Sequence, residues 1–255
     1  MAYCERVHVC LHVLRSDKQN SINRIIPIRL NKKQSIFAIS IIALIILIDQ
    51  CIKIWVKTNM SLYESHEVKS WFYIYFIENN CMAFGMSFII KTVLSLFRLV
   101  AIIAIGYYLY IQIKKGARWR FVILLSMLLA GAAGNLIDCM FYGLCFSPSG
   151  PHYVSQCVPF GEGYSTFLNG KVVDMFYFPL IVTDLPSWLP YWGGERFVFF
   201  SPIFNFADAS VSVSVILSFF LCRKELAEFA VSSEEKRNDE DGEDSIGKGD
   251  AADAS

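Results

Sequence analysis

The chain has 255 residues, 55% of them apolar, and a mean hydropathy of +0.43. This composition excludes an ordinary soluble domain of that length and indicates a membrane protein. The formal net charge is zero, yet the charges are segregated, because the first 34 residues carry seven Lys/Arg and two Asp/Glu while the last 23 carry nine acids and three bases. The two ends of the chain are therefore expected to be polar segments outside the membrane.

Four stretches are apolar enough to cross a bilayer as helices, for which about 20 mostly apolar residues are needed. They are residues 35–56, 93–113, 121–142 and 202–222. The length of the first stretch and the charges within it argue against a cleaved signal peptide. We therefore predict an α-helical membrane protein with four transmembrane helices.

Basic residues indicate which ends of these helices face the cytoplasm. They precede the first span, fill the loop between the second and third, and follow the fourth: Arg24, Arg29, Lys32, Lys33, Lys114, Lys115, Arg118, Arg120, Arg223 and Lys224. By the positive-inside rule, these three segments are cytoplasmic. We expect a cytoplasmic N-terminal segment at residues 1–34, a four-span domain at 35–224, and a disordered acidic cytoplasmic tail at 225–255.

The regions 57–92 and 143–201 are then expected on the extracytoplasmic side of the membrane. Residues 71–77, WFYIYFI, predict a strand at the membrane interface, because seven residues cannot cross as a helix and Trp and Tyr favour the headgroup level. Residues 143–201 contain Gly, Pro and Trp clusters that indicate a long ordered or semi-ordered loop. Together these regions predict an extracytoplasmic, β-rich cradle.

Polar side chains inside the predicted spans gather at one depth. At about 1.5 Å per residue, Asp49 lies roughly 20 Å above the cytoplasmic end of its span, and Asn135 and Asp138 lie at a similar height. The fourth span meets Asn205 and Asp208 within its first two turns from the outside. Since charges within a membrane are costly, this convergence suggests one shared site near the outer boundary.

A structural role remains an alternative for part of this group. Asp49 and Lys53, four residues apart on one helix face, could simply neutralise each other, and asparagines often join membrane helices. Asp208 has no Lys or Arg within a turn of its own span, so it must take up a proton or share one with another acid. Depth alone pairs Asp208 with Asp138. A proton- or ion-conducting protein and a non-enzymatic assembly factor are the rival functional classes.

Five short motifs occur along the chain. They are D-Q-x-x-K at 49–53, N-x-x-x-A-F-G at 79–85, G-N-x-x-D at 134–138, V-V-D at 172–174 and F-N-x-A-D at 204–208. In this order, and with this topology, they resemble the motifs of the lipoprotein signal peptidases, or type II signal peptidases. Two positions depart from the common pattern: Cys81 stands where a glycine is usual, and Cys139 stands where an arginine would be a possible hydrogen-bond donor.

The resemblance implies an intramembrane aspartic endopeptidase whose catalytic pair is Asp174 and Asp208. Two carboxylates about 3 Å apart cannot both ionise cheaply, so they share a proton, and one acts as base while the other acts as acid. No metal or organic cofactor is then required. The resemblance implies that further residues orient the acids, line the pocket or hold the helices: Asp49, Lys53, Asn79, Asn135, Asp138 and Asn205.

The resemblance also implies the substrate and the setting. The substrates would be diacylglyceryl-modified prolipoproteins, cut just before the lipidated cysteine, with membrane lipids as the other partner and no nucleic acid. The site would lie near the extracytoplasmic leaflet of a bacterial cytoplasmic (inner) membrane. We expect a monomer, since four spans can enclose the site within one subunit.

Overall fold

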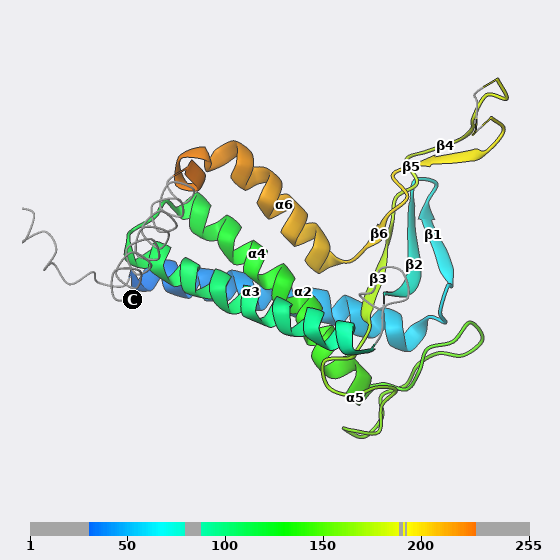
Figure 1. Ribbon diagram of the computed structural model, residues 1–255, viewed down its shortest axis with the longest axis horizontal. Coiled ribbons are helices and arrows are strands. Elements are labelled where there is room, and N and C mark those ends of the chain that lie inside the picture. Colours follow the sequence, from blue (N-terminus) through cyan, green and yellow to red (C-terminus); the bar gives the residue numbers. More distant parts are fainter. Residues whose placement is uncertain (1–30, 80–87, 189–190, 192, 228–255) are drawn as a thin grey trace, which may run out of the picture.

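The structure is a computed structural model, and it describes residues 31–79, 88–188, 191 and 193–227 (Figure 1). Some of the sequence predictions concern residues outside these ranges. Most of the N-terminal segment at 1–34 and of the acidic tail at 225–255 lies outside them, as does the motif at 79–85 after its first residue. The described part consists of a helical bundle with two small antiparallel sheets at one end.

Within the described residues, three helical segments are long and apolar enough to cross a membrane, and the first three predicted spans fall within them. They are α2 (Lys32–Asn59), α3 (Phe88–Lys114) and α4 (Trp119–Ile137), the last of which continues through η1 (Asp138–Tyr142) into α5 (Gly143–Cys145). The remaining helix, α6 (Phe206–Leu221), is apolar but has only 16 residues.

Helix α6 begins four residues later than the predicted fourth span. Asn205 caps it, because its side-chain oxygen accepts a hydrogen bond from the backbone N–H of Asp208 at 2.9 Å. The Asp208 carboxylate in turn accepts from the backbone N–H of Asn205 at 3.4 Å, which completes a capping box. The two residues before the cap form a strand, β6 (Ile203–Phe204), so they cannot belong to the helix.

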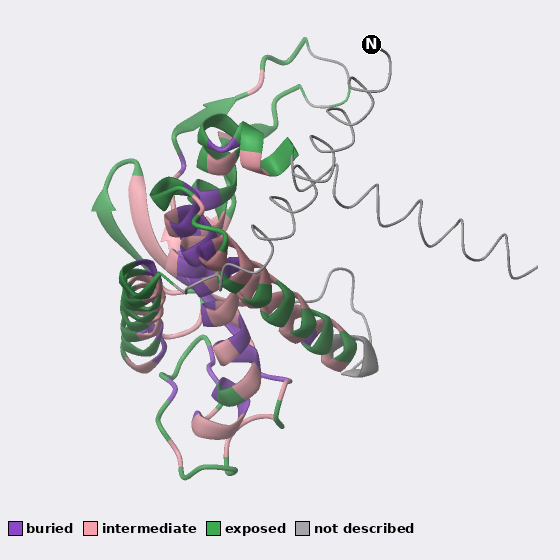
Figure 2. Cartoon of the chain, turned by 90° about the vertical axis from the view of Figure 1, so that its left-hand side faces the viewer, coloured by how far each residue is buried: buried purple, intermediate pink, exposed green. Residues whose placement is uncertain are grey.

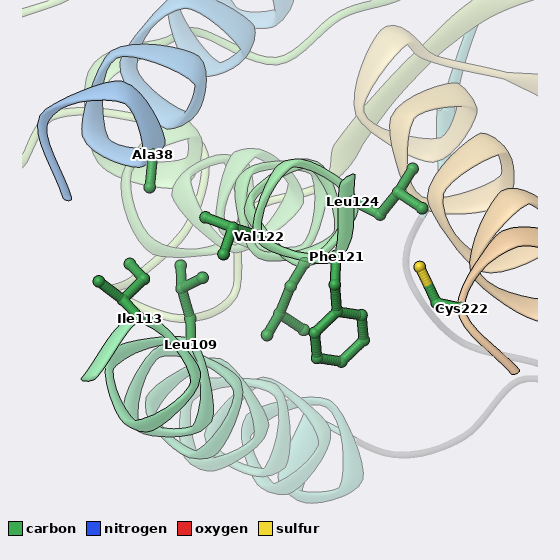
Figure 3. Close-up of a cluster of buried hydrophobic side chains, with 8 residues drawn as sticks. Ala38, Leu109, Ile113, Phe121, Val122, Leu124 and Cys222 are labelled. Atoms are coloured by element: carbon green, nitrogen blue, oxygen red, sulfur yellow. The ribbon is translucent and has the colours of Figure 1, made fainter. Parts of the chain in front are cut away.

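Helix α4 is the centre of the bundle and packs against α2, α3 and α6. Figure 3 shows one of the contacts, where Val122 of α4 faces Ala38 of α2 and Leu109 of α3. Helices α4 and α6 approach closely at Gly131, where an added Cβ would lie 2.4 Å from the backbone oxygen of Ala207. Small residues at such contacts are the usual means by which membrane helices pack.

The basic ends of the helices lie at one end of the bundle, as the sequence predicts. The side chain of Gln34, at the start of α2, donates to the backbone oxygen of Ala117 in the turn between α3 and α4 at 2.9 Å. Arg118, before α4, lies 3.8 Å from Glu225, which follows α6. The sheets lie at the opposite end of the bundle (Figure 1).

The larger sheet confirms the strand predicted at residues 71–77. Its antiparallel order is β1-β2-β3-β6, with β1 (Ser65–Lys69), β2 (Phe72–Asn79) and β3 (Val172–Tyr177). In its register, Ile77 lies opposite Asp174, and Phe176 lies opposite Phe204. Because Phe204 is followed directly by the cap of α6, this pairing brings Asp174 to the start of the helix that carries Asp208.

Burial follows the pattern of a membrane protein. Buried residues concentrate along the middle of the molecule, where the helices pack together and meet the sheet, while many outward helix positions are exposed (Figure 2). The exposed positions include large apolar side chains such as Ile39, Phe97 and Phe219. The fully buried side chains include several charged ones, and these form the site described next.

Candidate active site

The buried polar residues gather where the bundle meets the larger sheet. Asp49, Lys53, Asp138 and Asn205 are completely buried, and Asp174 is 3% exposed. They come from α2, from the junction of α4 and η1, from β3 and from the cap of α6. The structure thus brings together residues from all three helical faces that the sequence placed at one depth, and adds the strand that carries Asp174.

Lys53 joins α2 to the junction of α4 and η1. Its ammonium lies 2.9 Å from Asp49 Oδ2 and 2.8 Å from Asp138 Oδ2. It also donates a hydrogen bond of 2.8 Å to the side-chain oxygen of Asn135. An ammonium has three donors, so these contacts use all of them, and a buried charge with this set of partners is well compensated.

Asp49 has a structural role at the start of α6. Its Oδ1 accepts a hydrogen bond of 2.9 Å from the backbone N–H of Ala207, one of the N–H groups that a helix start leaves without an internal partner. Gly134 makes room for this contact, since a Cβ there would lie 2.8 Å from Asp49 Oδ2. The geometry favours the structural alternative for Asp49 and Lys53, in which the pair holds three helices together.

Asp174 is buried and accepts hydrogen bonds from two side-chain amides. Asn205 Nδ2 donates to Asp174 Oδ1 at 2.6 Å, and the side chain of Asn79 is a second donor. Burial and, after it, the negative charge of Asp208 raise the pKa of Asp174 to about 7, against the opposing effect of the Asn205 hydrogen bond. This raised pKa favours the protonated form of Asp174 over that of an ordinary exposed carboxyl.

Asp208 lies half-buried in the first turn of α6 and is held by the neighbouring amide. Asn135 Nδ2 donates to Asp208 Oδ1 at 2.7 Å, while Asn135 Oδ1 accepts from Asn205 Nδ2 at 3.1 Å. The two asparagines thus connect the two acids in a continuous series of hydrogen bonds, Asp174 to Asn205 to Asn135 to Asp208. Asp138, the partner that depth alone gave to Asp208, is instead bound to Lys53.

Gln50 belongs to the site, although the sequence did not single it out. Its side-chain nitrogen donates to Asp138 Oδ1 at 2.9 Å, and its oxygen accepts from the Tyr142 hydroxyl at 3.1 Å. The only sequence signal was its place inside the D-Q-x-x-K motif. A single uncharged amide in a span is not distinctive, so periodicity could not have identified it.

Of the two cysteines that depart from the common motif pattern, Cys139 lies in a described part of the chain and Cys81 lies outside the described residues. Cys139 is buried, and the guanidinium of Arg98, on α3, lies 3.5 Å from its sulfur. An arginine from a neighbouring helix therefore reaches the position next to Asp138. Cys145 and Cys157 are free thiols.

A second group of charges supports the strands beside Asp174. Glu78, at the end of β2, is paired with Lys57 of α2 and with Lys171, 3.0 Å away, and accepts from Ser149 at 2.7 Å. Burial alone would raise the pKa of Glu78, but the two ammonium groups and the hydrogen bonds outweigh it and hold the pKa below its usual range. This group, hereafter the Glu78 cluster, fastens α2 to the end of β2 and the start of β3.

Comparison with known proteins identifies the family of the chain. The signal peptidase II family matches residues 41–223. A lipoprotein signal peptidase of Porphyromonas gingivalis is 50% identical over 183 residues, which cover 70% of this chain and 79% of the relative. A lipoprotein signal peptidase of Amoebophilus asiaticus is 33% identical over 181 residues, which cover 68% of this chain and 72% of the relative. A solved bacterial membrane enzyme has 24% identity and a TM-score of 0.49, covering 72% of this chain and 90% of its own. The chain belongs to the signal peptidase II family of aspartic peptidases.

Proposed function

We propose that the chain removes the signal peptide from diacylglyceryl-modified prolipoproteins, cutting just before the lipidated cysteine, with Asp174 and Asp208 as its catalytic pair. The observation that supports this pair best is the series of hydrogen bonds through Asn205 and Asn135, which holds both acids at the start of α6. Processing of prolipoproteins is the activity of the family to which the chain belongs. In this proposal the two acids, linked through the two asparagines, carry out the chemistry together.

The two acids share one proton at neutral pH. The ionised member takes a proton from a bound water as the water oxygen attacks the scissile carbonyl carbon, and Asp174, whose pKa is raised to about 7, donates its proton to the carbonyl oxygen. The tetrahedral intermediate then collapses: the C–N bond breaks, the leaving nitrogen takes the proton that the base removed from water, and the carbonyl oxygen returns its proton to Asp174, which restores the pair with one proton. No metal or organic cofactor enters these steps.

The remaining site residues have positioning roles in this proposal. Asn205 and Asn79 set the orientation of the Asp174 carboxyl, and Asn135 sets that of Asp208. Lys53, held between Asp49 and Asp138, fixes Asn135 through its side-chain oxygen. The side chains that orient the two acids are thus held in place by further hydrogen bonds and ion pairs.

The placement in the membrane is part of the same proposal. Helices α2, α3 and α4 cross the bilayer, and α6, whose 16 residues rise about 24 Å, forms the fourth span together with the turn that follows it. The basic end of the bundle, with both termini, faces the cytoplasm. The acids then lie near the extracytoplasmic leaflet of a bacterial cytoplasmic membrane, where the lipid tails of a substrate can remain in the bilayer. The proposal includes a monomer, in which one subunit supplies both acids and the asparagines that hold them.

Reconstitution in lipid vesicles tests the proposed function. The full chain is incubated with a diacylglyceryl-modified precursor and, separately, with the same precursor lacking the modification, and the products are identified by mass spectrometry. We expect cleavage of the modified precursor only, with the lipidated cysteine as the new N-terminus. Cleavage at another bond, or equal cleavage of both precursors, would contradict the assigned specificity. Proton or ion flux in the same vesicles without cleavage would support the rival class.

A further inference from the structure

The second sheet is a hairpin that stands apart from the rest of the molecule. It consists of β4 (Ile181–Asp184) and β5 (Arg196–Phe199), and it is inserted between β3, which carries Asp174, and the start of α6. Figure 1 shows it extending beyond the larger sheet, on the side of the bundle where α6 lies. Neither the predicted spans nor the motifs account for it.

The two faces of the hairpin differ in polarity. Residues opposite each other in an antiparallel pair share a face, and alternate pairs lie on opposite faces. One face combines Ile181 and Phe199 with Thr183 and Phe197, and it carries no charge. The other face combines Val182 and Val198 with Asp184 and Arg196, which lie opposite each other. We call the first of these the uncharged face.

The uncharged face and the tip of the hairpin are exposed. Ile181, Phe197 and Phe199 are all exposed, and at the tip Trp188 is 78% exposed and Tyr191 is 94% exposed. A lone two-stranded hairpin is marginally stable in water, and contiguous exposed apolar surface marks a site of interaction. These side chains therefore need a partner that accepts both aliphatic and aromatic groups.

We propose that the hairpin is a membrane-interface anchor, with its uncharged face seated on the outer lipid leaflet and Trp188 and Tyr191 at headgroup depth. The hairpin lies on the side of the bundle where α6 lies (Figure 1), and the exposed residues of α6, such as Val213, Ile216 and Phe220, are apolar, as expected for a helix that faces lipid. Its opposed charges are confined to the other face, which can remain in water. Trp and Tyr are the residues that favour the membrane–water interface.

The anchor is separated from the catalytic pair by paired strands. Phe176 pairs with Phe204, and Tyr177 pairs with Ile203. These paired strand ends of β3 and β6 lie between the hairpin and both acids. Loss of the anchor should therefore leave the geometry of the two acids unchanged. It should weaken the seating of the extracytoplasmic region on the bilayer, and hence the capture of precursors that are themselves held in the membrane.

Fluorescence in nanodiscs with one protein copy each tests where the hairpin lies. The emission of Trp188 is obtained as the difference between the unaltered full chain and Trp188→Phe, in discs of ordinary phospholipid and in discs whose acyl chains are brominated close to the headgroup. We expect a blue-shifted component that brominated lipid quenches and aqueous iodide does not. This measurement requires no cleavage, so its failure is distinguishable from failure of the proposed function.

Three results would overturn the proposal. The first is a Trp188 component quenched by iodide and unaffected by brominated lipid, which would place the hairpin in water. The second is protection from iodide only in discs that hold two copies, which would make the hairpin a contact between chains. The third is protection only after addition of a precursor, which would make it a contact with the mature part of the substrate.

A pair of variants gives a functional readout. Ile181→Ser/Phe197→Ser/Phe199→Ser alters the uncharged face, and Val182→Ser/Val198→Ser is the matched control on the other face. We expect the first variant to raise the apparent KM for a membrane-held precursor with little change in kcat, and to lose the quenching by brominated lipid. The control should keep the KM and the quenching of the unaltered chain. Equal KM values for the two variants would contradict the anchor.

Discussion

Replacement of Asn205 separates the electrostatic and structural roles of one side chain. Its amide nitrogen donates to Asp174, and its oxygen caps α6. Asn205→Ser keeps a side-chain oxygen suited to a helix cap but removes the donor to Asp174. A hydrogen bond to a charged group contributes about 1.5–3 kcal/mol, and about 1.36 kcal/mol corresponds to one pKa unit. The donor stabilises the ionised carboxylate, so its loss should raise the pKa of Asp174 further above about 7, by about one unit or more.

The direction of the change in activity follows from the shared proton. The active pair holds one proton, so activity is lost on the alkaline side when the second acid ionises, and in Asn205→Ser this loss should move to higher pH. The assay is kcat/KM against pH with a lipidated precursor, since that ratio reports the free enzyme. Asn205→Ala should show the same shift and an additional loss of about 1 kcal/mol in stability, because it also removes the cap. An unchanged or acid-shifted alkaline limb in Asn205→Ser would refute the reasoning.

Three further changes test the supporting contacts. Lys53→Met leaves two buried acids without their cation and should cost about 3–5 kcal/mol of stability, part of which Lys53→Met/Asp138→Asn should recover in thermal unfolding. The pKa of Glu78 lies below its usual value of 4.5, so its pairing stabilises the fold above that pH and is lost as the pH falls; Glu78→Gln should flatten the acid side of a plot of Tm against pH. Gly131→Ala should cost about 1–3 kcal/mol by overpacking and lower activity, whereas Gly106→Ala, whose Cβ would be 3.8 Å from its nearest neighbour, should be tolerated in the same unfolding assay.

Much of the architecture could be predicted because it depends on local sequence. The long apolar stretches predicted the three long helices, and the aromatic run at 71–77 predicted β2, since each pattern reflects a local requirement of length or polarity. The start of α6 was predicted four residues too early, because hydropathy does not register the Asn205 cap or the pairing of Phe204 with β3. The β4–β5 hairpin was predicted only as part of a long loop, since its strands have four residues each.

The site was only partly accessible to reasoning from the residues. Depth within the helices brought Asp49, Asp138 and Asp208 together but could not supply Asp174, which lies on a strand and reaches the site through long-range pairing with β2 and β6. The resemblance to a known family supplied that residue. Gln50 was missed because nothing in a single neutral amide indicates that it will hold a carboxylate from another helix.

Cleavage by variants of the two acids tests the central claim most directly. The full chain, Asp174→Asn and Asp208→Asn are reconstituted with a diacylglyceryl-modified precursor, and the released signal peptide is quantified. Asp184→Asn, at an exposed position of β4, is the control. Asp174→Asn and Asp208→Asn should both fold, as judged by thermal unfolding, and should release no signal peptide. The Asp184→Asn control should cleave the precursor at the normal rate. Release of signal peptide at the normal rate by either folded variant would contradict the account.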